Sequence, residues 1–472
     1  RRRPAPAGRV VDGASRSLVA PRGKVLSAHA GPLVRKVITQ PAEECVMRPW
    51  KVLVLVAALT TSPVTALPAM AAVEPDPLVG HGVFNDPAGA VAAQNAIYAQ
   101  LGRLIDRVPA GGEVLGSVMD FDPPNTADTA DAPDIVDRLI AASQRGVKVK
   151  FITVAHSANT QATTRLRAAL GSNDAAGSYV VHCKDQFPNG PDRGCIATRA
   201  KEWSTGTVSA YNHSKFFTFS SVVLNNGTSI PNVVYQSSSN LTQWDENEAY
   251  NNAFTWTDAR TYAAYRTYFE DLRRYRYTAA GNNNYYQDTG SGTDYRAFFF
   301  PRQEPSGRPF DDPQTDTIHN TLQSVACSYT ENGTKRQTDI RIAMLDFNRP
   351  AIAQKLAELK GKGCWVDVVL TNANDAVISA LTNARIQTTR CDWNNGPGLD
   401  IRVHSKYMLL DGAYDDDIIP RVYTGSHNYS YSALRQADEQ VVRIMGRTVH
   451  DEYLRNFWSV RDTCRSHDGI IF

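Results

Sequence analysis

The hydrophobic positions of this chain predict the same succession of strands and helices twice. The strand–helix–strand runs cover 114–121, 134–145 and 147–154 in the first half, and 339–347, 351–362 and 365–370 in the second. The helical stretches carry apolar residues at spacings of three and four, whereas the strands alternate or are apolar throughout. A strand, a helix and a strand in this order form a βαβ unit. The pattern predicts an α/β protein made of two similar halves.

Smaller features recur at equivalent places in the two halves. Asp120-Phe121 and Asp346-Phe347 close the first strand of each run, and a glycine closes each helix. The longest polar, turn-forming stretch, 281–292, lies between the halves. Repeats of this length favour a duplicated domain over a solenoid. We therefore expect an N-terminal lobe at 72–290 and a C-terminal lobe at 291–472.

The chemistry-bearing residues are also duplicated. His213-Ser214-Lys215 and His404-Ser405-Lys406 each precede an apolar strand. Each is followed, on a predicted second strand, by a Ser-x-Asn sequence, which is Ser238 to Asn240 in one half and Ser426 to Asn428 in the other. Residues two apart on a strand share a face, so each histidine should lie beside its lysine. An imidazole, a fixed positive charge and small hydrogen-bonding groups suit a tetrahedral anion. One copy is weak evidence, but two copies are strong.

These paired motifs, the second completed by Asp411 and a following Gly-Ser-x-Asn, resemble the phospholipase D superfamily. The resemblance implies two α/β/α sandwich lobes with mixed sheets, related by a pseudo-twofold axis, with one site between them. It implies catalytic roles for His213, His404, Lys215, Lys406, Asn240, Asn428 and Glu439. Of these, the lysines and asparagines are expected to bind the phosphate, together with Ser238 and Ser426. By analogy with bacterial members we favour His213 as the nucleophile and His404 as the acid.

The resemblance also implies residues that orient the histidines, and here the first half departs from the pattern. Glu439 stands eleven residues after Asn428, where the family places an acid, but the matching residue in the first half is the neutral Asn251. Ser220 replaces the motif aspartate that is Asp411 in the second half, and Ser237 replaces a glycine. We expect Asp411 and Asn251 to be supporting residues.

Composition and charge limit the kinds of molecule that this chain is expected to bind. The formal charge of the whole chain is +2, but the first 71 residues hold eleven Lys and Arg against three acids, so residues 72–472 carry about −6. That balance disfavours a polyanionic partner. We expect a monomer without a stable nucleic-acid partner. Tyr285 and Tyr286 are compatible with transient contact with a membrane surface, although local packing is the commoner role of such a pair.

The N-terminal region predicts export. Residues 47–71 combine a short positive start, an apolar run too short to span a bilayer and a small-residue cleavage pattern, which together indicate a signal peptide. Residues 1–46 lack periodicity and are expected to be an unstructured leader. Six cysteines follow the signal peptide, and an even number in an exported chain favours disulfides. Cys183 and Cys195 are the expected pair, while the other four allow three pairings.

The sequence therefore predicts a secreted phosphodiesterase of phospholipase D type, which hydrolyses phospholipid head-group esters, or transfers them to an alcohol, through a phosphohistidine. We expect no cofactor and no dedicated metal site, since no nucleotide, zinc or calcium motif is present. Two alternatives stay open. One is a secreted nuclease of the same superfamily, and the other is a non-catalytic binding protein with the same fold, suggested by Ser220 and Asn251.

Overall fold

The computed structural model describes residues 74–124, 135–203, 206–396 and 400–472. The predicted leader at 1–46 and signal peptide at 47–71 lie outside the described residues. Everything below concerns the compact unit formed by Ala71–Phe472.

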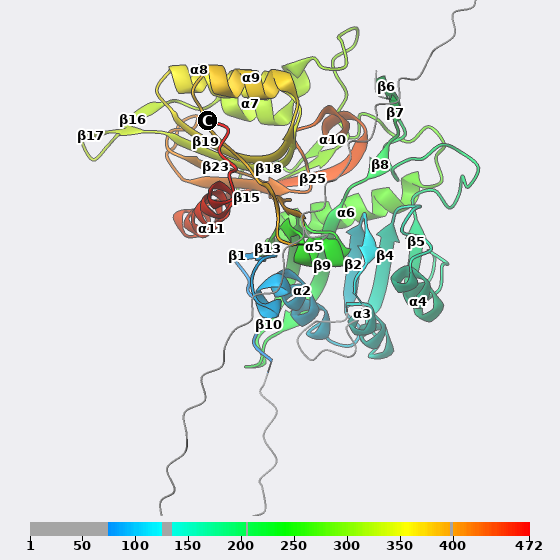
Figure 1. The fold of residues 1–472 in the computed structure, drawn as a ribbon. Coiled ribbons are helices and arrows are strands. Elements are labelled where there is room, and N and C mark those ends of the chain that lie inside the picture. Colours follow the sequence, from blue (N-terminus) through cyan, green and yellow to red (C-terminus); the bar gives the residue numbers. More distant parts are fainter. Residues whose placement is uncertain (1–73, 125–134, 204–205, 397–399) are drawn as a thin grey trace, which may run out of the picture. The chain divides into compact units, whose positions relative to one another are not determined.

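Two mixed sheets with the same strand order form the framework (Figure 1). The first sheet runs β1 (His81–Phe84), β13 (Asn252–Thr257), β10 (Ser229–Ser237), β9 (Lys215–Val223), β2 (Glu113–Val118), β4 (Lys148–Thr153), β5 (Tyr179–His182). The second runs β15 (Tyr295–Phe300), β25 (Ala437–Met445), β24 (Arg421–Gly425), β23 (Lys406–Asp411), β18 (Asp339–Phe347), β19 (Trp365–Ala373), β20 (Gln387–Arg390), with β14 (Gln287–Asp288) added outside β15. In both sheets the last three strands are parallel and the other neighbours antiparallel. The predicted duplication is confirmed.

Helices cover both faces of each sheet. The outer face of the first sheet packs on α2 (Ala96–Asp106), α3 (Ile135–Gln144) and α4 (Gln161–Leu170), and that of the second on α7 (Thr317–Gln323), α8 (Pro350–Gly361) and α9 (Asp375–Asn383). Between the sheets lie α6 (Ala259–Tyr275) and α11 (Arg447–Ser466) (Figure 1). Their shared core is aromatic, with Trp256, Tyr265, Phe299 and Tyr453 all buried. Because both faces are covered, the central strands are apolar almost throughout, as the sequence indicated.

Short elements connect these layers and carry the loops around the site. They are α1 (Val91–Gln94), β3 (Phe121–Asp122), β6 (Lys201–Trp203), β7 (Gly206–Val208), β8 (Tyr211–Asn212), β11 (Leu241–Thr242), α5 (Gln243–Asn247), β12 (Ala249–Tyr250), η1 (Pro313–Thr315), β16 (Ser328–Glu331), β17 (Thr334–Gln337), β21 (Asp392–Asn394), β22 (Asp400–Val403) and α10 (Tyr431–Arg435).

The two lobes are fastened to each other by buried polar contacts. Gln236 Nε2 donates to the carbonyl oxygen of Thr424 at 2.9 Å, and Asn252 Nδ2 donates to Thr424 Oγ1 at 2.7 Å. Gly425 follows Thr424, the residue that accepts both of these hydrogen bonds. A Cβ at Gly425 would stand 2.1 Å from the Gln440 carbonyl oxygen and 2.4 Å from Gln236 Nε2. The neighbouring strand of its own lobe and the Gln236 side chain of the other lobe leave no room for a Cβ, so this position needs glycine.

Three disulfides close loops within the lobes. Cys183 is bonded to Cys195, which confirms the expected pair, and the remaining bonds are Cys327–Cys364 and Cys391–Cys464. Tyr285 is buried against Tyr268, so it packs locally. None of the helices in the described part of the chain has the length and apolar character needed to cross a membrane.

We predict that the disulfides contribute to stability in the order of the loops they close. Loop-closure entropy assigns about 4 kcal/mol to Cys391–Cys464, whose cysteines are 73 residues apart, and about 3 kcal/mol to Cys183–Cys195, 12 apart. Paired Cys→Ser variants of residues 72–472, compared by urea unfolding, measure the two free energies of unfolding. A larger loss for the shorter loop would contradict this order.

Candidate active site

Each His-x-Lys motif begins on a strand that pairs with the other lobe. The strand before His213, β8, pairs in parallel with β25 of the second lobe, and the strand before His404, β22, pairs in parallel with β12 of the first. The backbone N–H of His213 donates to the Asp438 carbonyl oxygen, and that of His404 to the Tyr250 carbonyl oxygen, both at 2.9 Å. The long strands of the motifs start only at the lysines, so the histidines lie at a break between two strands. The prediction that each histidine shares a strand with its lysine was wrong in this detail.

The two histidines are held crosswise by the opposite lobe. His213 Nδ1 lies 2.8 Å from Glu439 Oε1, and His404 Nδ1 lies 2.8 Å from Asn251 Oδ1. Both partners are the residues that the sequence placed eleven positions after a Ser-x-Asn. Sequence spacing did not reveal that each partner orients the histidine of the other motif. All four side chains are buried.

The hydrogen bonds around Asn251 decide which nitrogen His404 presents. Asn251 Nδ2 faces the carbonyl oxygens of Asp245 and Ala249, so Oδ1 is the atom that faces the ring. That oxygen only accepts, so Nδ1 of His404 carries a proton. When Glu439 is ionised, its carboxylate can only accept, so a neutral His213 also carries its proton on Nδ1. Each imidazole then leaves Nε2 unprotonated and available for chemistry.

Asp245 is a site residue that the sequence did not reveal. Its Oδ1 lies 3.3 Å from His404 Nδ1, and the same oxygen accepts from the backbone N–H of Asn240. Although burial opposes ionisation, the hydrogen bond and the charge of His404 lower the pKa of Asp245. Asp245 thus supplies the negative charge that Asn251 lacks. It sits three residues after Thr242, the N-cap of α5, a spacing that indicates only a helix start.

The two lysines are buried and act on both motifs. Nζ of Lys215 donates to the carbonyl oxygen of His213 at 3.0 Å, and Nζ of Lys406 to that of His404 at 2.6 Å. Burial lowers the pKa of Lys215 to about 8, and burial and then the charge of Lys215 lower that of Lys406. Burial and both lysine charges also lower the pKa of His213. Burial and the charge of Lys406 lower the pKa of His404 to about 3. Since each lysine acts on both histidines, the two motifs share one electrostatic environment.

The Ser-x-Asn residues are fixed symmetrically. Asn240 Oδ1 accepts from the backbone N–H of Asp120 at 3.3 Å, and Asn428 Oδ1 from that of Asp346 at 3.4 Å. Ser238 Oγ donates to Asn251, and Ser426 Oγ donates to Glu439. The serine hydroxyls therefore brace the side chains that orient the histidines. Phosphate contacts by the two asparagines and the two serines stay predictions.

The residues at which the first motif departs from the family pattern have local structural partners. Ser220 Oγ accepts from the backbone N–H of Glu113 at 2.9 Å, which ties β9 to the start of β2. Asp411, in the matching place, forms a double hydrogen bond to Arg447 at 2.6 and 2.8 Å. Ser237 Oγ accepts from the backbone N–H of Ser239. These contacts fit supporting roles.

One group of metal-ligating residue types comes close enough together among the described residues, namely Cys183, Cys195 and Asp438. The two cysteines are joined in a disulfide, so neither offers a thiolate. The Asp438 carboxylate accepts from the backbone N–H groups of residues 195–197. This cluster is a structural tie between the lobes.

The sequence model of a family described as "Cardiolipin synthase, PLD-like domain" matches residues 126–273 and 333–461, more than half of the chain. The chain belongs to the phospholipase D superfamily. Members of this superfamily act on phosphodiester bonds, and the fold and the duplicated motifs described above are those that the resemblance implied. A search of curated proteins finds no match.

Solved structures resemble this superfamily member only distantly. Phosphatidylserine synthase from Haemophilus influenzae shares 12% identity over 79% of this chain and 85% of its own, with a TM-score of 0.48. Polyphosphate kinase from Porphyromonas gingivalis shares 12% over 76% of this chain, with a TM-score of 0.46, and only 44% of that enzyme is covered. The phospholipase D family member Nuc from Salmonella typhimurium shares 21% over 31% of this chain and 85% of its own, with a TM-score of 0.24. Likeness of this degree says nothing about substrate.

We predict that anion binding at this phospholipase D site weakens as the lysines lose their protons. Sulfate stays a dianion from pH 6 to 10, so a change in its affinity reports the protein. Because the pKa of Lys215 is about 8, affinity should fall above that pH, by about tenfold per pH unit for each lysine that must be charged.

Isothermal titration calorimetry at constant ionic strength measures this affinity. Lys215→Met should make the pH-dependent part smaller and leave only the share that comes from Lys406. Lys150→Met, which removes a lysine paired with Glu113, should leave the pH-dependent part intact. Affinity that is constant up to pH 10 would contradict the prediction.

Proposed function

We propose that this protein is a secreted phosphodiesterase of phospholipase D type that cleaves the head-group ester of phospholipids through a phosphohistidine. The observation that supports it most is the crosswise hold on His213 and His404, each of which is hydrogen-bonded at Nδ1 to the opposite lobe. The other nitrogen of each ring, Nε2, is then left for chemistry. Such a reaction needs one nitrogen that accepts the phosphoryl group and one that transfers protons, and two Nε2 atoms among buried lysines suit these two roles.

In the first step, Nε2 of His213 attacks phosphorus. A P–N bond forms, the P–O bond to the head-group alcohol breaks, and the departing alkoxide takes a proton from Nε2 of His404. The neighbours favour this assignment of roles. Asp245, whose pKa is lowered, stabilises an imidazolium on His404, whereas burial raises the pKa of Glu439, the partner of His213, to about 8.

In the second step, His404 accepts a proton from water, which attacks phosphorus and breaks the P–N bond. Phosphatidate and free His213 result, and an alcohol in place of water gives a transfer product instead. The low pKa of His404 in the free protein means that it gains its proton with the anionic substrate, whose charge offsets that of Lys215 and Lys406. Those lysines, with Asn240 and Asn428, stabilise the charge on the phosphoryl oxygens.

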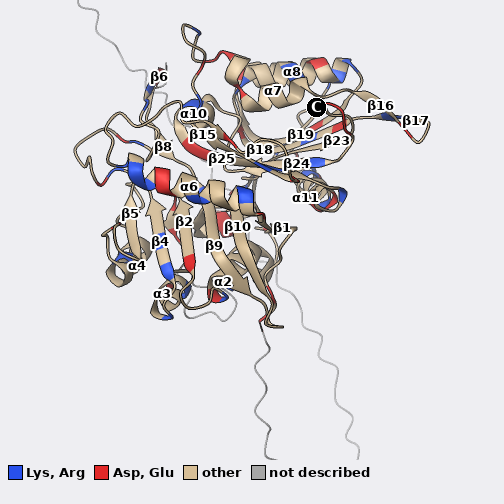
Figure 2. Ribbon diagram, turned by 180° about the vertical axis from the view of Figure 1, so that it is seen from behind, with Lys and Arg blue, Asp and Glu red and all other residues tan. Residues whose placement is uncertain are grey.

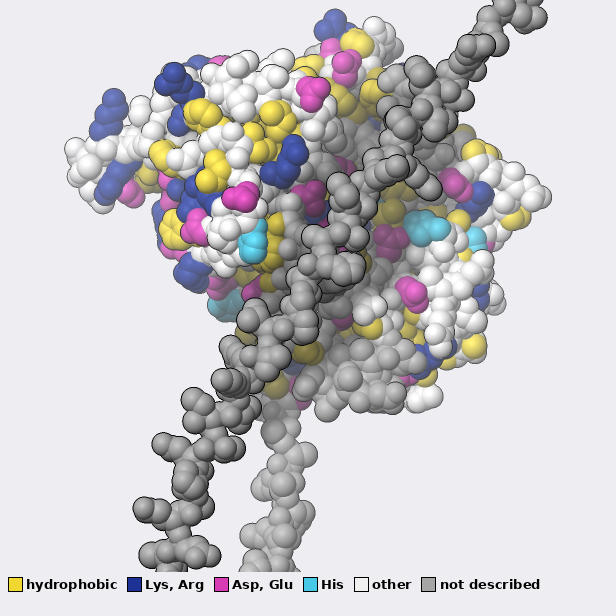
Figure 3. Space-filling model, viewed as in Figure 1, with side chains coloured by type: hydrophobic (Ala, Val, Ile, Leu, Met, Phe, Trp, Pro, Cys, Tyr) yellow, Lys and Arg dark blue, Asp and Glu magenta, His cyan; other side chains and the backbone are white. Residues whose placement is uncertain are grey.

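A lipid substrate fits the charge of the molecule better than a nucleic acid does. Residues 72–472 carry about −6, and positive and negative residues are interspersed in both lobes and along α6 (Figure 2). On the face seen in Figure 3, the side chains that are not grey also mix both signs. Nucleic-acid binding depends on phosphate contacts from clustered Lys and Arg. The three disulfides are compatible with secretion.

We predict that His213→Ala and His404→Ala each lower phospholipid hydrolysis by at least about a thousandfold, since each removes a group that acts on the reacting atoms. The assay measures choline released from phosphatidylcholine vesicles, with plasmid DNA tested in parallel. Circular dichroism checks folding, and His81→Ala, at the exposed His81–Glu452 pair of β1, is the control. Substantial activity in either catalytic variant would contradict the two-histidine mechanism, and cleavage of DNA alone would replace the lipid substrate.

We predict further that the two variants differ with an activated substrate. Nitrophenolate needs no acid to depart, so His404→Ala should release one equivalent of nitrophenol rapidly from a phosphatidyl-p-nitrophenol ester and then stall as the phosphohistidine. His213→Ala should show no such burst. Stopped-flow absorbance measures the burst, and mass spectrometry locates the phosphoryl group. A burst in His213→Ala would reverse the two roles.

A further inference from the structure

A third histidine stands at the edge of the site in the first lobe. His156 Nε2 is hydrogen-bonded to Asp120 Oδ1, and the two side chains are 58% and 33% exposed. Asp120 lies between β2 and β3, and its backbone N–H is the group that holds Asn240. Asp120 therefore links His156 to the side-chain amide of Asn240, which is predicted to bind phosphate. The side chains of Asp120 and His156 are nevertheless partly exposed to solvent.

The contact is built into the fold. The segment that carries His156, between β4 and α4, is fastened to the end of β2 by side-chain hydrogen bonds. Thr153 Oγ1 and Ser157 Oγ donate to the Met119 carbonyl oxygen, at 3.0 and 3.1 Å, and Thr160 Oγ1 donates to that of Phe121 at 2.7 Å. Such fastening holds the ring at the carboxylate. A casual pair of surface side chains would have no such support.

The second lobe provides an internal comparison. Asp346 takes the place of Asp120, since its backbone N–H holds Asn428 in the same way. Asp346 on β18 lies opposite the neutral Asn372 on β19. Burial raises the pKa of Asp346. In the first lobe the hydrogen bond to His156 and the charge of Lys215 outweigh burial and lower the pKa of Asp120. The two equivalent carboxyl groups of the pseudo-symmetric site therefore differ, and Asp120 ionises more readily than Asp346.

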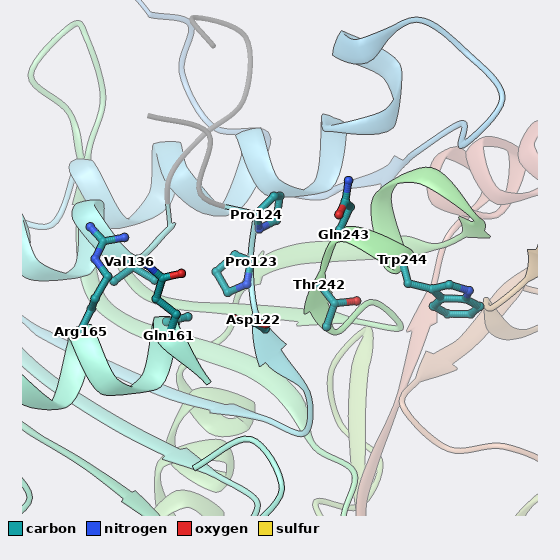
Figure 4. Close-up of a pocket in the computed structure, with 10 residues that line it drawn as sticks. Asp122, Pro123, Pro124, Val136, Gln161, Arg165, Thr242, Gln243 and Trp244 are labelled. Atoms are coloured by element: carbon teal, nitrogen blue, oxygen red, sulfur yellow. The ribbon is translucent and has the colours of Figure 1, made fainter. Parts of the chain in front are cut away.

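A cavity of about 410 Å³ lies in the first lobe, close in sequence to Asp120 and His156 (Figure 4). Its lining includes Asp122, two residues after Asp120, and Gln161, five after His156. On the other side it reaches Thr242, Gln243 and Trp244, and the Trp244 ring meets the His404 ring edge to face at 5.1 Å. The cavity is thus lined by residues that follow Asp120 and His156 in the sequence, and one of its lining residues, Trp244, contacts the ring of the proposed acid, His404.

A phosphodiester joins two different alcohols, and a site with twofold symmetry alone would not distinguish them. We propose that Asp120 and His156 are specificity-determining residues, which bind a hydrogen-bond-donating head-group alcohol, such as an amino alcohol, on the first-lobe side, with the cavity beside Trp244 receiving the rest of it. The inference rests on the proposed phosphodiesterase function. The carboxylate accepts from the ammonium or hydroxyl group, and the imidazole fixes the carboxylate.

Two substrates that differ only in the amino group test this. Dioctanoyl phosphatidylethanolamine and dioctanoyl phosphatidylethanol share the lipid and the ester. His156→Asn, which copies the amide of the second lobe, and Asp120→Asn should each lower kcat/KM for the ethanolamine lipid about tenfold or more relative to the ethanol lipid. His81→Asn, in a similar exposed His–carboxylate pair, should not change the ratio. An equal loss on both lipids, or no loss, would overturn the inference.

Binding separates this inference from the proposed reaction. Calorimetry with O-phosphoethanolamine and ethyl phosphate needs no turnover. The wild-type protein should bind phosphoethanolamine more tightly, and His156→Asn should remove the difference. Equal affinities in the wild type would overturn the inference even if the enzyme is active. A preference for phosphoethanolamine without hydrolysis of any diester would instead sustain the subsite and reject the proposed function.

Discussion

The site depends on hydrogen bonds that cross between the lobes. His213 is held by Glu439 and His404 by Asn251, so neither motif has an oriented imidazole unless both lobes are folded and docked. The backbone also crosses between the lobes, because β8 of the first lobe pairs with β25 of the second, and β22 of the second pairs with β12 of the first. A duplicated fold thereby becomes one catalytic unit. At Gly425, the Gln236 side chain of the first lobe comes so close that a Cβ would stand 2.4 Å from its Nε2, which shows how little room this docking leaves.

Burial gives these contacts their chemical effect. Lys215, Lys406, Glu439 and Asp245 are each at most 2% exposed, and an isolated buried charge is costly. The cluster is tolerable because opposite charges face one another. Burial lowers the pKa of both lysines and both histidines, and the lysine charges lower those of Lys406, His213 and His404 further. An anionic phosphate would reverse these shifts. We expect the positive charges of the two lysines to favour a tetrahedral anion here, while Ser238 and Ser426 hold the side chains that orient the histidines.

Periodicity predicted the strand–helix–strand runs and the duplication, the loop between Cys183 and Cys195 indicated their bond, and the resemblance to the family implied Glu439 and Asn251 as partners of the histidines. They did not predict which lobe orients which histidine, because an eleven-residue spacing carries no information about the crossing of β8 and β22. Asp245 was missed for a related reason, since Thr242-x-x-Asp245 is also an ordinary helix start. The other two disulfides join cysteines that only the packing of β20, α11 and α8 brings together. Local pattern thus reveals elements, whereas contacts between distant segments require the fold.

The most direct test of the account is a crystal structure of residues 72–472 with tungstate bound. A single tungstate should lie between the lobes, within hydrogen-bonding distance of Nε2 of both His213 and His404 and of Nζ of both Lys215 and Lys406. A tungstate that contacts only one motif, or two tungstates in separate pockets, would contradict the claim that the two motifs form one site.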